Sequence, residues 1–302
     1  MTSTNERSAL IRAMPWVFVL IWSTGFIVAR YGMPHAPPLT FLAMRYALSL
    51  LCFGAWIVLV GIEWPRERAQ WLHLAAVGVL IHAGYLGGVW AAVKAGIGAG
   101  TVALLVGLQP VLTALWMSWA SRGAHRSAAR VQPRQWLGLA LGLGGLTLVV
   151  WHKLGGGEVT PWNLALAVFA LLSITIGTLY QKRFVAPCDV RTASAVQLVA
   201  AFAVSLPLAL LEPEPVVWHA EMIGALVWSV LVLTLGGSSL LYLLIQRGAA
   251  TEVTSLMYLV PPCTAALAWL LFEEAFTWSM GAGMLLTATG VALVVRAPTR
   301  SD

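Results

Sequence analysis

Few polar side chains interrupt the apolar stretches of this 302-residue chain, and those few are the candidates for chemistry. His82 and Tyr85 stand three residues apart in one such stretch, so a helix would place them side by side on one face. Together they could offer hydrogen bonds to a polar substrate. The alternative is a packed histidine bonded to a neighbouring backbone carbonyl, because an unpaired imidazole at that depth is costly.

Prolines occur at similar points of two other apolar stretches. Pro110 follows Gln109, and the pair Pro261 and Pro262 comes one turn after Tyr258. Proline removes a backbone donor and clashes with the preceding turn, so the freed carbonyls need a partner or a water-filled cavity. Interrupted helices at matching positions of two halves are typical of a transport site. The pattern predicts a central site with these prolines as gate or hinge; a kink that only shapes packing is the alternative.

Aromatic rings and an amide complete the set of candidate binding residues. Trp22 lies inside the first apolar stretch, and Tyr242 and Gln246 lie one turn apart late in the eighth. Such groups suit an amino acid or a similar amphipathic metabolite, although aromatic packing explains each one alone. The residues that we expect to bind substrate are His82, Tyr85, Gln109, Trp22, Tyr242, Gln246 and Tyr258.

Charged residues within the apolar stretches are rarer still. Arg45, early in the second stretch, could hold an anionic group or tie the helix end to backbone carbonyls, and the second interpretation is favoured. No stretch carries an Asp or Glu near its middle, which favours neutral or zwitterionic substrates. His82 is then the credible titrating group near the midplane.

Familiar catalytic and metal-binding motifs are missing from the sequence. It has no GxxxxGK[ST], HExxH or GxSxG pattern, so it offers no ATP site and no visible protease or esterase centre. Its three cysteines form no CxxC motif, which gives neither a disulfide framework nor a metal site. We therefore expect no enzyme activity, no cofactor and no metal.

The elements that must position these residues are membrane helices. Apolar residues make up 59% of the chain and charged residues 10%, and the mean hydropathy is +0.82. So few charges cannot cover a soluble protein of this size, so the bilayer is the expected surrounding. The net charge of +6 comes from short clusters between apolar runs, which is typical of membrane loops and not of a nucleic-acid-binding surface.

Ten apolar stretches are long enough to cross a membrane, and the basic residues orient them. Of the 18 Lys and Arg, Arg30, Lys94 and Lys153 fall on one side and Arg45 within a stretch, which leaves fourteen on the other side. This bias predicts cytoplasmic N- and C-termini. The expected spans are 13–29, 39–61, 71–93, 100–121, 135–151, 162–181, 192–211, 221–245, 253–272 and 276–296.

The two halves of the chain resemble each other. Residues 90–112 align with residues 242–264 at a constant offset of 152, which pairs Gly96 with Gly248 and Pro110 with Pro262. Five spans per half is an odd number, so the second half starts on the opposite side of the membrane and the repeat is inverted, as in many secondary transporters. We expect one five-helix repeat in residues 1–152 and another in residues 153–302.

The ordered set of motifs resembles the EamA-domain family of the drug/metabolite transporter superfamily. The resemblance implies ten helices in two inverted halves, and carriage of small metabolites across the bacterial inner membrane, often outward. By this analogy Glu274, nine residues before Gly283, is a packing or gating residue. In the second half, Gln197 stands where the equivalent of Arg45 is expected, so the arginine is not used symmetrically. The segments that carry the resemblance are Ile21–Gly32 (IWSTGFIVARYG), Phe41–Leu51 (FLAMRYALSLL), Gly98–Trp116 (GAGTVALLVGLQPVLTALW) and Leu271–Val295 (LFEEAFTWSMGAGMLLTATGVALVV).

The expected function is therefore secondary transport of amino acids or related metabolites out of the cell by alternating access. A channel-like facilitator, or an exporter of drugs, nucleosides or sugars, is the alternative. The expected partners are a small-molecule substrate and the lipid bilayer, with no nucleic acid, and the protein is a monomer or a homodimer.

Overall fold

Every regular element in the described part of the chain is a helix. The computed structural model describes residues 4–62, 64–120, 133–155, 157–237, 239–240, 244, 257–275 and 277–295. The elements are α1 (Thr4–Gly32), α2 (Pro38–Val60), α3 (Arg68–Gly78), η1 (Val79–Leu86), α4 (Gly87–Lys94), α5 (Ala99–Val106), α6 (Gln109–Ala120), α7 (Pro133–Gly155), α8 (Pro161–Phe184), α9 (Val190–Ala209), α10 (Ala220–Trp228), η3 (Ser229–Gly236), η4 (Met257–Leu259), α13 (Val260–Phe272) and α14 (Trp278–Val295).

The expected all-α membrane chain is confirmed in its coarse form. Five described helices are long and apolar enough to cross a membrane: Ala13–Gly32, Pro38–Val60, Arg68–Lys94, Pro161–Phe184 and Val190–Ala209. Five shorter apolar helices cover Ala99–Thr113, Trp136–Trp151, Ala220–Gly236, Val260–Phe272 and Trp278–Leu293.

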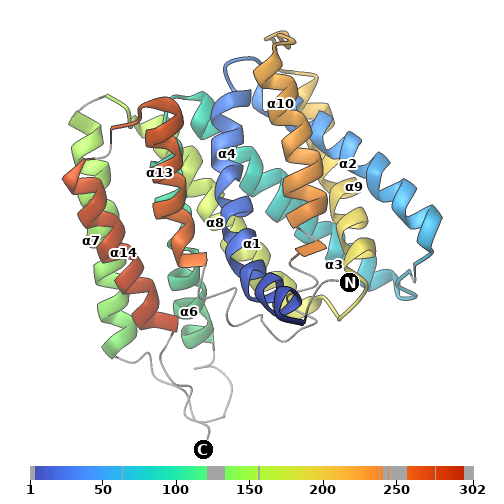
Figure 1. Cartoon of the computed structure of the whole chain (residues 1–302), viewed down its shortest axis with the longest axis horizontal. Helices are drawn as coiled ribbons and strands as arrows, with labels where there is room; N and C mark the ends of the chain where they lie inside the picture. The colour runs from blue at the N-terminus through green and yellow to red at the C-terminus, as the bar shows by residue number, and fades with distance from the viewer. Residues whose placement is uncertain are drawn as a thin grey trace, which may run out of the picture.

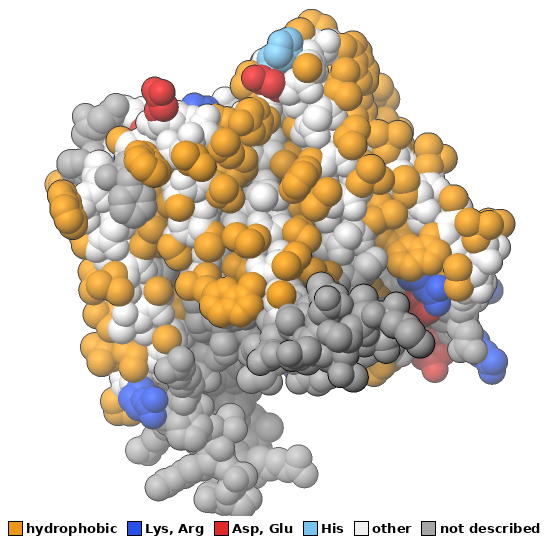
Figure 2. Space-filling model, in the orientation of Figure 1, with side chains coloured by type: hydrophobic (Ala, Val, Ile, Leu, Met, Phe, Trp, Pro, Cys, Tyr) orange, Lys and Arg blue, Asp and Glu red, His pale blue; other side chains and the backbone are white. Residues whose placement is uncertain are grey.

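The surface is apolar along the middle of the helices, as contact with a bilayer requires. Large apolar side chains such as Leu51, Leu172 and Leu285 face outward from the middle of their helices. Figure 2 shows apolar side chains over the body of one face, with charged side chains at its upper and lower edges.

Helices from early and late parts of the sequence pack against each other. In Figure 1, α7 and α14 lie side by side at one edge of the molecule, α1 runs through the middle, and α2 and α9 lie at the other edge. α1 contacts α10, α2 contacts α9, α5 contacts α13, and η1 contacts α8. The helices of residues before 152 are thus joined pairwise to those after it.

Glycines permit the closest of these contacts. A Cβ atom placed on Gly145 of α7 would lie 2.4 Å from the carbonyl oxygen of Gly283 on α14. A Cβ on Gly290 would meet the carbonyl oxygen of Gly138 at 2.3 Å. Small residues let helix backbones approach within a membrane, so α7 and α14 form a tightly packed pair.

Two segments of eight residues adopt π-helical geometry. They are η1 and η3, whose starts at Val79 and Ser229 lie 150 residues apart. A wide helical turn leaves carbonyls without their usual donors, and side chains supply them here. The Tyr46 hydroxyl donates to the His82 carbonyl at 2.8 Å, and the Thr234 hydroxyl donates to the Ser229 carbonyl at 2.8 Å. π-Helical turns often mark functional sites.

The prolines that we expected to interrupt the fourth and ninth stretches begin helices instead. α5 ends at Val106, two residues intervene, and α6 begins at Gln109 with Pro110 next. α13 begins at Val260 and carries Pro261 and Pro262 in its first turn. Proline is suited to a first turn because its missing N–H has no helical partner there. The break in the fourth stretch therefore lies just before the proline.

Carboxylates cap the amino ends of α2 and α5. These ends lie where α10 also begins, and we call this end of the bundle the capped end. Glu212 accepts hydrogen bonds from the Leu39 and Thr40 amides at 3.0 and 2.8 Å. The Ala99 amide donates to Glu274 at 3.1 Å, and the Gly98 amide donates to Glu158 at 3.0 Å. Negative groups are favourable at helix amino ends, and the donors and acceptors here come from distant parts of the sequence.

Candidate functional site

Two adjoining cavities lie between the helices, with volumes of about 110 and 120 Å³. Both are lined by Trp22, Phe26, Tyr85 and Ile174, so these four side chains form the boundary between them. They come from α1, η1 and α8. The cavities thus meet where the first, third and sixth apolar stretches converge.

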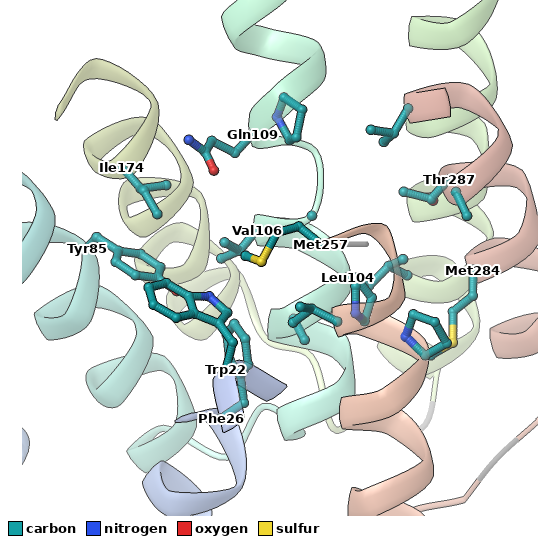
Figure 3. Close-up of a pocket in the computed structure, with 18 residues that line it drawn as sticks. Trp22, Phe26, Tyr85, Leu104, Val106, Gln109, Ile174, Met257, Met284 and Thr287 are labelled. Carbon is teal, nitrogen blue, oxygen red and sulfur yellow. The ribbon is translucent and has the colours of Figure 1, made fainter. Parts of the chain in front are cut away.

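The first cavity is mostly apolar and lies beside the helix breaks. Leu104, Val106 and Met284 line it, as do Gln109, Pro110 and the Pro261–Pro262 pair. Figure 3 shows Gln109 on one side of this space and Met284 and Thr287 on another, with Trp22 and Tyr85 nearby. The Gln109 amide donates to the Thr178 hydroxyl at 2.9 Å.

The second cavity carries the polar groups. Arg45, His82, Tyr85 and Thr234 line it together with Trp90. Arg45 Nε and Nη2 donate to the Thr234 hydroxyl at 3.2 and 3.1 Å, and its guanidinium carbon lies 5.6 Å from the Trp90 ring centre. The two cavities together form an apolar chamber with a polar end.

The structure brings most of the expected residues together. Trp22, His82, Tyr85 and Gln109 line one or both cavities, and so do Pro110, Pro261 and Pro262. Tyr242 and Gln246 lie outside the described residues, and Tyr258 is described only as part of the backbone of η4.

Arg45 differs from the expectation favoured by the sequence. We expected it to tie the helix end to backbone carbonyls, but its hydrogen bonds within the described chain go to the Thr234 side chain. It borders the cavity and is 7% exposed. The reason is that α2 packs against η3, which brings Arg45 to Thr234, 189 residues later in the sequence. The sequence does not predict this contact.

Sequence analysis missed several lining residues, namely Phe26, Trp90, Ile174, Thr234, Met284 and Thr287. Most of these are apolar and resemble any packed helix residue. Thr234 had a signal, since it lies 152 residues after His82, as Gln197 lies 152 after Arg45. In the structure each residue contacts the counterpart of the other pair. Arg45 donates to Thr234, and the Gln197 side chain interacts with His82.

Glu274 lies away from the cavities, at the capped end. Besides accepting from the Ala99 amide, it lies 3.9 Å from the Arg30 guanidinium. Its contacts are those of a residue that packs the start of α5, and gating is the other role that the resemblance allowed.

A cluster of three side chains with possible metal-ligand atoms also lies at the capped end of the described residues. His35, His219 and Glu221 have ligand atoms within 4.8 Å of one another. The His35 ring is 3.0 Å from the Glu221 carboxylate and stacks on His219. These residues join the α1–α2 connection to the start of α10 and do not border either cavity.

Comparison with known proteins gives transporters. An uncharacterised transporter of Bacillus subtilis, YvbV, is 26% identical over 294 residues, covering 96% of this chain and 92% of that protein. An inner membrane transporter of Escherichia coli, YedA, also uncharacterised, is 24% identical and covers 82% of this chain and 74% of its own length. A Salmonella typhimurium protein named "Probable amino-acid metabolite efflux pump" is 24% identical and covers 92% of both chains. These names indicate transport and not catalysis.

The fold is shared with a solved crystal structure. The TM-score is 0.64 with 18% sequence identity, and the match covers 93% of this chain and 95% of the other. The model of the EamA-like transporter family matches residues 13–151 and matches again over residues 161–296. With almost the whole chain covered by two copies of this match, the protein belongs to the EamA-like transporter family, as the sequence motifs predicted.

Proposed function

We propose that this protein is a secondary transporter that exports amino acids or related small metabolites across the bacterial inner membrane by alternating access. In this proposal ten helices cross the membrane, both termini are cytoplasmic, and residues 1–152 and 153–302 are two inverted repeats. The name of the Escherichia coli relative supports the inner membrane, and the name of the Salmonella relative supports export of amino-acid metabolites.

One observation carries this proposal: the cavities lie between the two proposed repeats, beside the starts of α6 and α13. Pro110 is the second residue of α6 and Pro261 the second residue of α13, and both line the same cavity. Broken helices that face one another across a repeat interface are the usual location of a transporter substrate site. The polar side chains of His82 and Gln109 line these cavities as well.

The capped end supports an alternating mechanism. Lys94 and Glu214 form an ion pair at 2.6 Å, and the His35 ring lies 3.0 Å from Glu221. Each contact joins the first proposed repeat to the second. The capped end corresponds to the outer side in the expected topology, so rocking of the repeats would break these contacts to release substrate outward.

The test is counterflow in proteoliposomes without an ion gradient. Vesicles are loaded with unlabelled amino acids, and labelled amino acids are supplied outside. A carrier accumulates label transiently and saturates with substrate concentration. Uptake without saturation or counterflow would indicate the channel-like facilitator instead, and failure with amino acids but success with sugars, nucleosides or drugs would change the substrate class.

Two variants link transport to the cavities. We expect His82→Ala and Gln109→Ala to lower exchange without lowering the yield of folded protein, because both side chains line the site but lie on different helices. Equal exchange at equal protein level would remove these residues from the site.

A further inference from the structure

We infer that Arg45 holds the carboxylate of the transported substrate, and that the substrate is a small carboxylate with an apolar body. The inference rests on the proposed transport function and adds the group by which the site recognises its ligand. It departs from the sequence argument, which favoured a structural role for Arg45.

The guanidinium of Arg45 is buried with donors to spare. Two of its nitrogens share one acceptor, the Thr234 hydroxyl, which in turn donates to the Ser229 carbonyl. The third nitrogen, Nη1, has no hydrogen-bond partner among the residues that the structure describes. A guanidinium carries five N–H donors, so the described residues leave part of this group unsatisfied in a side chain that lines the cavity.

Within the described part of the chain, no carboxylate lines the cavities to balance the charge of Arg45. Arg45 is the one charged side chain among the described residues that line the two cavities. The carboxylates of Glu158, Glu212 and Glu274 bind helix amino ends at the capped end instead. A buried charge without a partner is unfavourable, so an anion that enters the cavity gains an interaction that the described residues do not provide.

A second unsatisfied donor borders the same cavity. Trp90 is 2% exposed, and its indole N–H has no partner within the described chain. Its ring lies against the Arg45 guanidinium. A carboxylate has two oxygens and matches the planar fork of arginine, so the proposal places it on the Arg45 guanidinium with Trp90 as a neighbouring donor.

The neighbouring cavity describes the rest of the substrate. From the shared boundary at Trp22 and Tyr85, the first cavity continues between Leu104, Val106 and Met284. An apolar chain or ring fits these walls. No described lining residue is acidic, so an ammonium group would meet only neutral acceptors. A 2-oxo acid therefore satisfies the site at least as well as the amino acid with the same side chain.

The first experiment measures binding without transport. Purified protein in detergent is heated with 4-methyl-2-oxopentanoate, with leucine, and with 4-methylpentanamide, which has a similar shape but no charge. We expect the two carboxylates to raise the unfolding temperature of the wild type more than the amide does. In Arg45→Gln the apparent affinity for the carboxylates should fall roughly tenfold to a hundredfold, whereas the response to the amide should not fall.

Matched variants separate a site from a general charge effect. Lys182→Gln removes one positive charge from an exposed position of α8 and should behave as the wild type. Arg45→Lys keeps the charge without the fork and should bind carboxylates with intermediate affinity. If Arg45→Gln does not fold, Arg45→Lys and Thr234→Val, which removes the hydroxyl that orients the guanidinium, decide the question in its place.

Counterflow with the same compounds distinguishes failure of this inference from failure of the proposed function. Exchange that is unchanged in a folded Arg45→Gln protein overturns the inference and leaves transport intact. Arg45-dependent binding without any exchange supports the carboxylate site but contradicts transport. Equal binding of carboxylates by the wild type and the Arg45 variants, or no preference for the acid over the amide, also overturns the inference.

Discussion

At the scale of single residues, the hydroxyl of Tyr46 is a sensitive position. It is fully buried and donates to the His82 carbonyl within the π-helical segment. We predict that Tyr46→Phe lowers the free energy of unfolding by about 1–3 kcal/mol, because it leaves a buried carbonyl without its donor. Chemical unfolding in detergent, followed by circular dichroism, measures the change.

Tyr31→Phe is the control for this substitution. Its ring packs against Phe272, and it is only half-buried. It should lose much less stability than Tyr46→Phe. Equal losses would mean that the bond to His82 has no special weight.

The sequence predicted candidate residues better than it predicted their partners. His82, Tyr85 and Gln109 were identifiable because a polar side chain in an apolar run has few explanations. The partner of Arg45 was not identifiable, since the offset of 152 pairs Thr234 with His82 and not with Arg45, and the contact depends on how α2 meets η3. Phe26 and Ile174 gave no signal, because lining a cavity and filling a core require the same side chains.

At the scale of elements, two adjacent glycines of α7 should respond differently to a methyl group. Gly145→Ala would place a Cβ 2.4 Å from the backbone of α14, whereas Gly144→Ala meets nothing within 4 Å. We predict that Gly145→Ala lowers the free energy of unfolding by about 1–3 kcal/mol through overpacking. Gly144→Ala should be neutral or stabilise by about 0.5–1 kcal/mol. Equal effects in a thermal unfolding assay would contradict close packing of this pair.

The ion pair at the start of α9 should make the stability of the protein depend on pH. The side chain of Arg191 donates to Asp189 and holds the pKa of this carboxyl below its ordinary value. A lowered pKa in the folded state means that the charged form stabilises the protein above the ordinary aspartate pKa, and that this contribution disappears as the pH falls through the folded value.

Asp189→Asn tests this by removing the charge while keeping a capping oxygen. Wild type and variant should differ by less than about 1 kcal/mol in free energy of unfolding near neutral pH, because the pair is partly exposed. The difference should shrink as the pH is lowered below about 4. A difference that stays constant across this range would assign the effect to something other than the charge.

The positions of the helices were predictable, and their internal form was not. Apolar run length placed an apolar helix in each of the ten expected stretches, of which five are long enough in the described residues to cross a membrane. The π-helical turns of η1 and η3 depend on hydroxyl groups from other turns and helices, such as that of Tyr46. The helix break lies before Pro110 because a proline fits the first turn of a helix. The local sequence does not predict the exact residue at which the break occurs.

At the scale of the whole molecule, contacts at the capped end join the two proposed repeats. If these repeats must separate there, a reversible cross-link should stop exchange. The test uses Lys94→Cys with Glu214→Cys in a background without Cys52, Cys188 and Cys263. A short linker that contains a disulfide joins the two new cysteines. We predict that the cross-linked protein loses counterflow and recovers it when the linker is reduced. The measurement is counterflow before and after reductant.

A second cross-link serves as the control. Trp64→Cys and Trp71→Cys lie within the first proposed repeat, where their rings stack at 5.4 Å. The same linker there should leave exchange unchanged. Exchange that persists with the capped end cross-linked would mean that this end does not open.

The cap on α5 has a consequence for biosynthesis. The Ala99 amide finds its acceptor in Glu274, which the ribosome adds 175 residues later. Until then the amino end of this helix lacks this acceptor, although a negative group is favourable there. The first half of the chain is therefore an unfinished folding unit when it leaves the translocon. The start of α5 therefore gains this hydrogen bond only after the segment that precedes α14 has been synthesised.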